Sequence, residues 1–288
     1  MFTNKVDVMM FGLKWFFIVY ILTIFFGVAY VFAENEIDIN AVGDNAEFNL
    51  TQTGDGNQID INVCHFSGQT PSDYCSTVGD QSERSDITIT QTGNNNEAEV
   101  FVWFKNSDDN DVTITQTTSG GFVRVWTNED DKDITVTQNS DSNVNLYMYG
   151  VNITATVSQS GANGHYAQLY TKNNGTNNTM TLTQSSSSAS DGRITMNKNV
   201  DNAVVTATQS GSGAHDLDVL IKKKEDASNL TITQTGSGSH TADITVENGS
   251  GGAQTYTLLQ QGSTNQSVTV SFTCNTAGGC SASLTQGS

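Results

Sequence analysis

Residues 87–102 read ITITQTGNNNEAEVFV, and this stretch contains the pattern that decides the fold. Apolar side chains alternate with Thr up to Gln91, and after the polar residues 93–96 they alternate again up to Val102. A period of two residues indicates a strand, because successive side chains point to opposite faces of a sheet. Gly and Asn between the two runs are typical of a tight turn. The stretch therefore predicts a strand, a turn and a second strand, with Gln91 on the apolar face.

The same unit recurs along the rest of the chain. Glutamines stand in this context at Gln52, Gln91, Gln116, Gln138, Gln159, Gln184, Gln209, Gln234, Gln260 and Gln286, with successive spacings of 39, 25, 22, 21, 25, 25, 25, 26 and 26 residues. One such unit cannot bury its apolar face, whereas stacked units bury a continuous core. We therefore predict an all-β protein, a β-solenoid of about nine to ten strand-turn-strand repeats with two parallel sheets. An array of β-hairpins is the alternative.

A glutamine at the same inward position of each repeat predicts an internal hydrogen-bonded ladder. A buried amide is costly unless it is hydrogen-bonded. In a column of in-register strands each amide can donate to the next. The alternative is that glutamine only marks the end of each first strand. Under both interpretations the glutamines are structural.

The first 33 residues have the features of an export signal. Lys5 and Lys14 come before the apolar run 15–32, and Ala33 fits the small residue at a cleavage site. We expect residues 1–33 to be a signal peptide, the only contact with a membrane, and residues 34–288 to be the solenoid. An uncleaved membrane anchor is the alternative, because the run is just long enough to span a bilayer.

Four cysteines agree with an oxidising compartment. Cys64 and Cys75 lie within the one long spacing, so we interpret residues 63–80 as a loop insertion, and Cys274 and Cys280 lie six residues apart. Pairing within each of these two couples needs no long-range closure, so we predict the disulfides Cys64–Cys75 and Cys274–Cys280. A metal site is the alternative, but CxxC spacing is missing.

The chain is acidic, with 30 acidic and 12 basic side chains and a formal net charge of −18 at pH 7. This charge excludes non-specific binding to nucleic acid, because a phosphate backbone would be repelled. The sequence contains no nucleophile elbow, zinc-protease motif, phosphate loop or dinucleotide fingerprint. We therefore expect a protein that is not an enzyme and that has no cofactor, apart from the calcium considered next.

Two acidic triplets hold the same position in consecutive repeats. They comprise Asp108, Asp109 and Asp111 before Gln116, and Asp130, Asp131 and Asp133 before Gln138. Stacking would bring six mutually repelling carboxylates together, and a calcium ion with oxygen ligands would relieve the repulsion. The alternative is a solvated acidic loop near Lys132.

Three histidines also share a position. His165, His215 and His240 each lie six residues after a repeat glutamine. We expect them at exposed turn positions. A metal held by His215 and His240 is the alternative, although two histidines without a third ligand make a poor site.

Threonine fills the positions that alternate with the apolar residues of the first strands. Stacking would align these threonines in columns on one outer face, from Thr88 and Thr90 through Thr231 and Thr233. Such a lattice resembles the ice-binding face of some antifreeze solenoids. The alternative is that Thr simply suits an outward strand position.

The repeat resembles a known family. Residues 91–98, QTGNNNEA, match the curlin repeat motif Gln-x-Gly-x-x-Asn-x-Ala, and the units that begin at Gln52 and Gln260 match most of it. Curlins are the subunits of curli, the extracellular functional-amyloid fibres of Gram-negative bacteria. The resemblance covers roughly residues 46–288 and implies a β-solenoid, a secreted or cell-surface location and a role in adhesion and biofilm.

We therefore expect a secreted structural subunit that assembles with itself, with other curli-type subunits and secretion machinery as further partners. A monomeric β-solenoid adhesin and an ice-binding protein are the alternatives. The resemblance leaves the secretion route open.

The two ends of the expected solenoid are complementary. Residues 36–40, EIDIN, copy residues 58–62, QIDIN, which form a second strand, whereas residues 283–288 contain only a first strand. Each end would then carry half a turn of the solenoid. An unpaired strand edge is a template for another chain, so we predict a head-to-tail contact that generates a filament.

Overall fold

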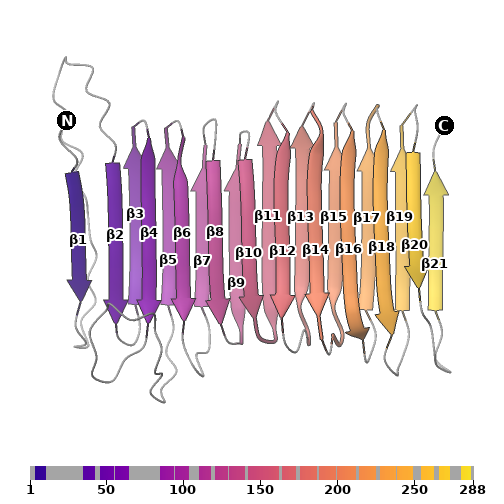
Figure 1. Ribbon diagram of the computed structural model, residues 1–288, viewed down its shortest axis with the longest axis horizontal. Helices are drawn as coiled ribbons and strands as arrows, with labels where there is room; N and C mark the ends of the chain where they lie inside the picture. The colour runs from indigo at the N-terminus through magenta and orange to yellow at the C-terminus, as the bar shows by residue number, and fades with distance from the viewer. Residues whose placement is uncertain are drawn as a thin grey trace.

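A computed structural model describes the chain over twenty segments. These are residues 4–10, 35–42, 46–54, 56–64, 85–93, 95–103, 110–117, 121–128, 130–139, 142–161, 164–172, 176–186, 188–198, 200–211, 214–224, 228–237, 239–248, 254–262, 266–272 and 280–286. The described residues form twenty-one strands in two parallel sheets (Figure 1). Within them no helix is long and apolar enough to cross a membrane.

The strands alternate between the two sheets along the chain. The eleven-stranded sheet contains, in spatial order, β1 (Asn4–Met10), β2 (Asn35–Val42), β4 (Asn57–Cys64), β6 (Glu97–Trp103), β8 (Gly121–Asn128), β10 (Ser142–Tyr149), β12 (His165–Lys172), β14 (Ser190–Asn197), β16 (His215–Lys224), β18 (His240–Asn248) and β20 (Gln266–Phe272). The ten-stranded sheet contains β3 (Ala46–Thr53), β5 (Ser85–Thr92), β7 (Asn110–Gln116), β9 (Lys132–Gln138), β11 (Ile153–Gly161), β13 (Thr179–Ser186), β15 (Val204–Ser210), β17 (Ser228–Thr235), β19 (Gln254–Gln261) and β21 (Cys280–Gln286).

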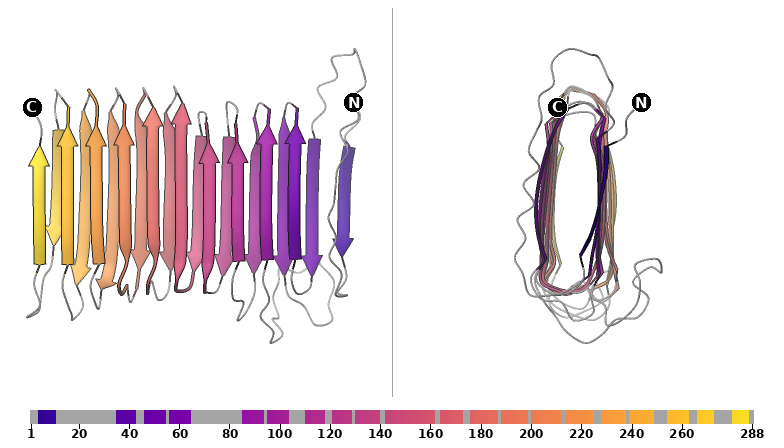
Figure 2. Two further views of the ribbon diagram at one scale, coloured as in Figure 1. Left: turned by 180° about the vertical axis from the view of Figure 1, so that it is seen from behind. Right: turned by 90° about the vertical axis from the view of Figure 1, so that its left-hand side faces the viewer.

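The core is the thin space between the two sheets, as the end-on view in Figure 2 shows. Along β5 buried and half-buried residues alternate strictly, as the period of two predicts. Equivalent residues stack on each other, so that Ile87 pairs with Val112 and Ile89 with Ile114, all of them buried. The predicted β-solenoid is confirmed, and the strand pairs β3/β4 to β19/β20 form nine successive turns.

The glycine two residues after a repeat glutamine allows the turns to stack closely. Gly93 has a φ of 155°, and a Cβ atom there would overlap the Gly54 carbonyl of the preceding turn. A Cβ atom at Gly236 (φ 121°) would overlap the Gly211 carbonyl in the same way. Where glycines of consecutive turns stack in this way, the corner requires glycine for lack of space as well as for backbone conformation. In other repeats Thr118, Ser140 and Ser186 hold this position in the sequence.

The first strand lies within the segment expected to be a signal peptide. β1 pairs in parallel with β2, with Val6 beside Ile37 and Val8 beside Ile39. The apolar run 15–32 lies outside the described residues. In the full chain β1 thus occupies the outer edge of β2.

Candidate functional site: the glutamine ladder and the ends of the solenoid

The glutamine ladder is present and runs through the middle of the solenoid. From Gln138 to Gln234 the Nε2 of each glutamine donates to the Oε1 of the one before it, so that six glutamines from Gln116 onward are linked, at 2.6, 3.4, 2.9, 2.9 and 3.1 Å. All six side chains of this run are fully buried. The ladder is confirmed, and it satisfies amides that would otherwise be costly to bury.

Several of the ladder amides also connect the two sheets. In four turns Nε2 donates at 2.9 to 3.1 Å to a backbone carbonyl of the facing strand: Gln159 to Tyr166, Gln184 to Asp191, Gln209 to Asp216 and Gln234 to Thr241. The amide therefore fixes the corner within a turn as well as the stacking between turns.

The ladder stops before it reaches the ends of the solenoid. The Oε1 atoms of Gln52 and Gln91 accept no hydrogen bond, and neither polar atom of the Gln260 side chain has a partner among the described residues. The side chain of Gln286 lies outside the described residues, although its backbone pairs with Gln260. The hydrogen-bonded unit is thus the central run of six glutamines.

The structure uses part of the two acidic triplets for hydrogen bonding. Asp111 pairs with Asp133 in register, as stacking predicts. Asp130 accepts from the Val151 N–H at 2.7 Å, and Asp131 accepts from the Asn152 side chain at 2.7 Å. Asp108 and Asp109 lie outside the described residues, among which no group of three or more His, Cys, Asp or Glu side chains could hold a metal. Calcium binding stays a prediction.

Lys132 is turned inward, although it lies next to Asp131 and Asp133 in sequence. Its side chain is 2% exposed, and Nζ donates to the Tyr149 carbonyl at 3.2 Å. The expectation of a solvated acidic loop near this lysine therefore has to be corrected for Lys132 itself, because the ammonium is bound inside the corner.

A second ladder, of asparagines, runs along the corner that precedes the first strands. Asn152 donates to Asp131, Asn177 to Asn152 and Asn202 to Asn177, at 2.7, 2.9 and 2.9 Å. All four residues have positive φ, between 47° and 56°. Asn and Asp tolerate this left-handed conformation better than most residues. Sequence reasoning missed the ladder, although each member lies seven residues before a repeat glutamine.

The three histidines are buried, which corrects the expectation of exposed turn positions. His165, His215 and His240 are 2%, 1% and 0% exposed. The rings of His215 and His240 stack at 5.1 Å with an interplanar angle of 7°. Both ring nitrogens of His215 lack a hydrogen-bond partner in the part of the chain that the structure describes. Burial, and then the neighbouring His240 and His165, lower the pKa of His215 to about 4, so that it is neutral at pH 7.

Two of the four cysteines lie in described strands. Cys64 ends β4 and Cys280 begins β21, whereas Cys75 and Cys274 lie outside the described residues. The two local disulfides therefore stay a prediction.

The threonines form the lattice that the repeat predicts. Thr88, Thr113, Thr135, Thr156, Thr181, Thr206, Thr231 and Thr257 pair in one unbroken column across the ten-stranded sheet. In the second column Ser158 and Leu259 interrupt the run of threonines. The outer face of this sheet is accordingly flat, polar and regular.

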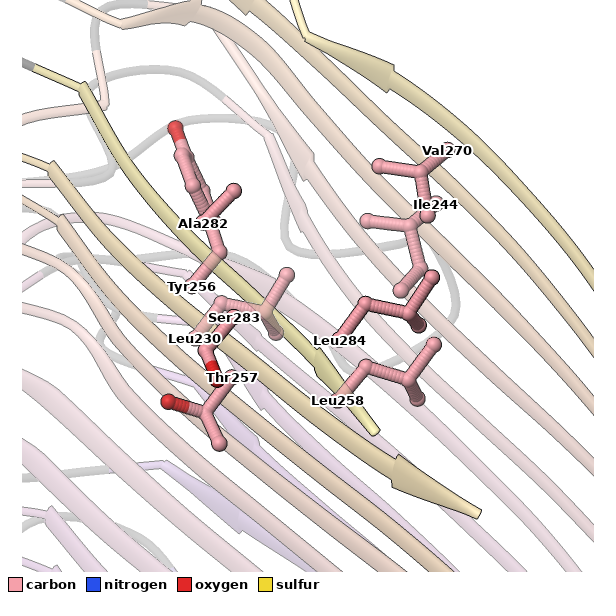
Figure 3. A pocket seen from close by; sticks show the side chains of 9 residues that line it. All are labelled: Leu230, Ile244, Tyr256, Thr257, Leu258, Val270, Ala282, Ser283 and Leu284. Atoms are coloured by element: carbon pink, nitrogen blue, oxygen red, sulfur yellow. The ribbon is translucent and has the colours of Figure 1, made fainter. Parts of the chain in front are cut away.

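The C-terminal end of the solenoid is open. Val270 and Leu284, 37% and 59% exposed, are the exposed large apolar side chains among the described residues. They continue the columns of the buried Ile244 and Leu258. Figure 3 shows Leu258 and Leu284 of one sheet opposite Ile244 and Val270 of the other, around a pocket of about 230 Å³.

The strand edges at this end are also free. β20 and β21 are the last strands of their sheets, so each has an unpaired edge within the described part of the chain. At the other end the equivalent apolar residues Ile37 and Ile39 of β2 and Phe48 and Leu50 of β3 are buried. The exposed apolar edge is therefore confined to the C-terminal end.

Carboxylates stack on the outer face near the N-terminal end. Asp38, Asp60 and Glu99 are consecutive in register across β2, β4 and β6. Burial, together with the neighbouring Asp38 and Glu99 and against the hydrogen bond from Gln58, raises the pKa of Asp60 to about 6. The ionisation of Asp60 at neutral pH therefore makes the folded state less stable than it is at acidic pH.

Comparison with known proteins identifies the repeat. Residues 83–117, which contain β5, β6 and β7, match the family model of the curlin associated repeat. Searches among curated proteins and solved structures gave no match. The match falls on the unit that carries the complete motif at residues 91–98. The chain is thus an all-β solenoid in which residues 83–117 are similar to the curlin associated repeat.

Proposed function

We propose that the protein is a secreted structural subunit that assembles head to tail into extracellular fibres for adhesion or biofilm matrix. The observation that carries this proposal is the exposed apolar edge at β20 and β21, where Val270 and Leu284 continue the core columns without cover. The curlin repeat at residues 83–117 supports the same function.

The strand count supports a complementary junction. Removal of residues 1–33 takes away β1 and leaves ten strands in each sheet, with β2 at one end and β21 at the other. Placing two subunits end to end then pairs β20 with β2 in one sheet and β21 with β3 in the other. The alternation between the sheets continues across the junction. Such a heterologous contact does not close on itself and generates a filament.

The junction is stabilised in the same way as the turns within a subunit. It places Leu284 and Val270 against Phe48, Leu50, Ile37 and Ile39, which occupy the inward positions of β3 and β2. Burying one large aliphatic side chain contributes about 1.5–3 kcal/mol, and the free strand edges gain backbone hydrogen bonds.

The test is fibre growth of the chain that starts at Glu34, seeded with preformed fibres and followed by thioflavin fluorescence. Leu284→Asp places a charge in the apolar junction and is expected to slow elongation at least tenfold. Thr285→Asp adds the same charge on the outer face of the same strand and is expected to elongate within about threefold of the parent. Circular dichroism checks that both variants keep the β-sheet signal of the parent. Equal elongation of Leu284→Asp and the parent would overturn the proposal.

A second candidate function is ice binding, and the threonine lattice of the ten-stranded sheet favours it. One column holds eight threonines in register, from Thr88 to Thr257. Thermal hysteresis of unassembled protein tests this candidate, with Thr181→Lys in the middle of the lattice as the variant. The fibre-subunit proposal expects no hysteresis in either protein.

A further inference from the structure

The two outer faces of the solenoid differ in chemistry. On the ten-stranded sheet the aromatic residues of the described strands, Phe48 and Tyr256, point inward and are buried. On the eleven-stranded sheet a ladder of half-buried rings crosses four neighbouring strands on the outside. This aromatic ladder consists of Phe101, Trp126, Tyr147 and Tyr170, which pair in register across β6, β8, β10 and β12.

The ladder is a continuous row of rings along the solenoid axis. Neighbouring centroids lie 6.2, 5.7 and 6.1 Å apart, and the rings are tilted against each other by 38° to 58°. Phe122 and Tyr166 lie two columns away on the same face, and Tyr149 lies in the column on the other side. This face therefore offers apolar ring surface at the spacing of successive strands.

Planar polar groups lie between the rings. Arg124, Asn145 and Gln168 form the column between the ladder and Phe122 and Tyr166. Gln168 Oε1 accepts from the Tyr166 hydroxyl at 3.3 Å and from the Tyr147 hydroxyl at 3.5 Å. The side-chain N–H groups of these residues stand beside the rings as hydrogen-bond donors.

The charge of this face differs from that of the rest of the molecule. Three of its four strands, β8, β10 and β12, contain no Asp or Glu, although the chain has 30 such residues and a net charge of −18. The fourth strand, β6, holds Glu97 and Glu99, and Glu99 forms an ion pair with Arg124 at 2.7 Å. Arg124 and Lys172 are the cations on these three strands. Each of them also lies over a ring, Arg124 over Phe122 at 5.1 Å and Lys172 over Tyr149 at 5.6 Å. Lateral packing of a second acidic copy on this face and binding of a nucleic acid to it would both bring strong negative charge here, and both are disfavoured.

We propose that this aromatic face binds an extended polysaccharide of uncharged sugars, whose chain lies along the solenoid axis. Sugar rings present apolar C–H faces that stack on aromatic rings, and their hydroxyls accept from and donate to planar amide and guanidinium groups. Few but well-placed polar groups among aromatic side chains are typical of ligand sites. Because the strand spacing of about 4.8 Å is close to the rise of one sugar in an extended β-linked chain, successive sugars meet successive rings.

The experiment is native gel electrophoresis of the unassembled protein in gels that contain hydroxyethyl cellulose, with xylan and laminarin in parallel gels. The protein is expected to be retarded in at least one of them, with a change in Trp fluorescence on addition of the same polymer in solution. Trp126→Ala and Tyr147→Ala are expected to weaken binding at least tenfold. Tyr147→Phe keeps the ring and is expected to stay within about threefold.

The matched control is Thr135→Ala on the opposite sheet, which should be retarded like the parent. Lack of retardation in all three gels would overturn the proposal, and so would equal retardation of Trp126→Ala and the parent. If sedimentation instead shows lateral association that Trp126→Ala abolishes, the face is an interface between copies and the proposal is wrong. None of these outcomes depends on fibre growth, because Leu284 lies at the C-terminal end and outside this face.

Discussion

A glutamine in the middle of the ladder makes contacts in two directions, along the solenoid axis and across the core. Gln184 donates to Gln159 at 2.9 Å and to the Asp191 carbonyl at 3.1 Å, and it accepts from Gln209 at 2.9 Å. Gln260 occupies the same position near the C-terminal end, but both polar atoms of its side chain lack a partner in the described structure. The chain thus contains a matched pair of equally buried glutamines with different hydrogen bonding.

Gln184→Leu is expected to lower the free energy of unfolding by about 3 kcal/mol, because it removes the donor to Gln159 Oε1 and to the Asp191 carbonyl and the acceptor for Gln209 Nε2. Gln260→Leu removes no hydrogen bond and is expected to change this free energy by less than about 1 kcal/mol. Chemical denaturation of both variants checks the difference. Equal losses would mean that the ladder contributes through packing alone.

Buried histidine gives the solenoid a pH dependence. His215 has a pKa of about 4, against 6.5 in the unfolded chain, so that between these values the unfolded state binds more protons. The contribution of His215 to stability is therefore complete above pH 6.5 and is lost as the pH falls toward 4. Asp60, whose pKa is raised to about 6, acts in the opposite direction, because its protonation stabilises the folded state as the pH falls.

His215→Phe isolates the histidine effect, because it keeps a ring beside His240 and removes the titrating group. At pH 8 the variant and the parent are expected to have similar stability. At pH 4.5 the variant is expected to be more stable by about 2 kcal/mol. Thermal unfolding followed by circular dichroism between pH 4 and 8 measures the difference. A difference that does not change with pH would contradict the assignment.

At the scale of the element, the corners of each turn depend on particular residues, as the strands do. At the corner after the repeat glutamine, Gly93 leaves no room for a Cβ atom beside the Gly54 carbonyl. The opposite corner uses an asparagine in the left-handed conformation, such as Asn177 with φ 56°, tied to its neighbours Asn152 and Asn202. The two corners are therefore built from different residues for the same reason, a positive φ.

Two substitutions at Asn177 separate backbone conformation from the side-chain ladder. Asn177→Ala loses both the ladder bonds and the tolerance of positive φ, and is expected to cost about 1–2 kcal/mol of unfolding free energy. Asn177→Gly keeps the backbone freedom and is expected to cost about half as much, because the lost hydrogen bonds are exposed. Denaturant unfolding ranks the two variants. An equal or larger loss for the glycine variant would contradict the role of positive φ at this corner.

At the scale of the whole molecule, the N-terminal edge of the solenoid is covered in the full chain. β1 pairs with β2 over seven residues, on the edge that the proposed junction would use. A strand edge that is already paired does not template another chain. Strand β1 is therefore expected to block the proposed head-to-tail junction in the full chain.

The full chain is accordingly expected to elongate preformed fibres much more slowly than the chain that starts at Glu34. Val8→Pro in the full chain removes a backbone N–H from β1 and is expected to recover part of the elongation rate. Seeded thioflavin assays under identical solution conditions compare the three proteins. The covering role of β1 is wrong if the full chain elongates as fast as the shortened one.

The sequence by itself determined the period, the fold class and the ladder. Alternation such as that of residues 87–102 allows one face of each strand to be buried, and a one-residue slip would turn every side chain to the wrong face. The spacing of 21 to 26 residues between Gln91 and Gln286 then fixes which side chains stack. For this reason the threonine columns and the central glutamines could be predicted residue by residue.

Only the tertiary structure decided what happens at positions where the period ends. His215 and Lys132 begin β16 and β9 in phase with the buried Leu217 and Ile134, so their burial follows from where these strands start, which the turn-rich sequence before them does not mark. Similarly, the sequence shows Trp126, Tyr147 and Tyr170 as scattered outward residues of separate repeats. Parallel pairing brings residues 21 to 25 apart to neighbouring positions, and this creates the aromatic ladder. Local pattern defines a strand and its faces, whereas contacts between distant repeats depend on the stacking of the whole solenoid.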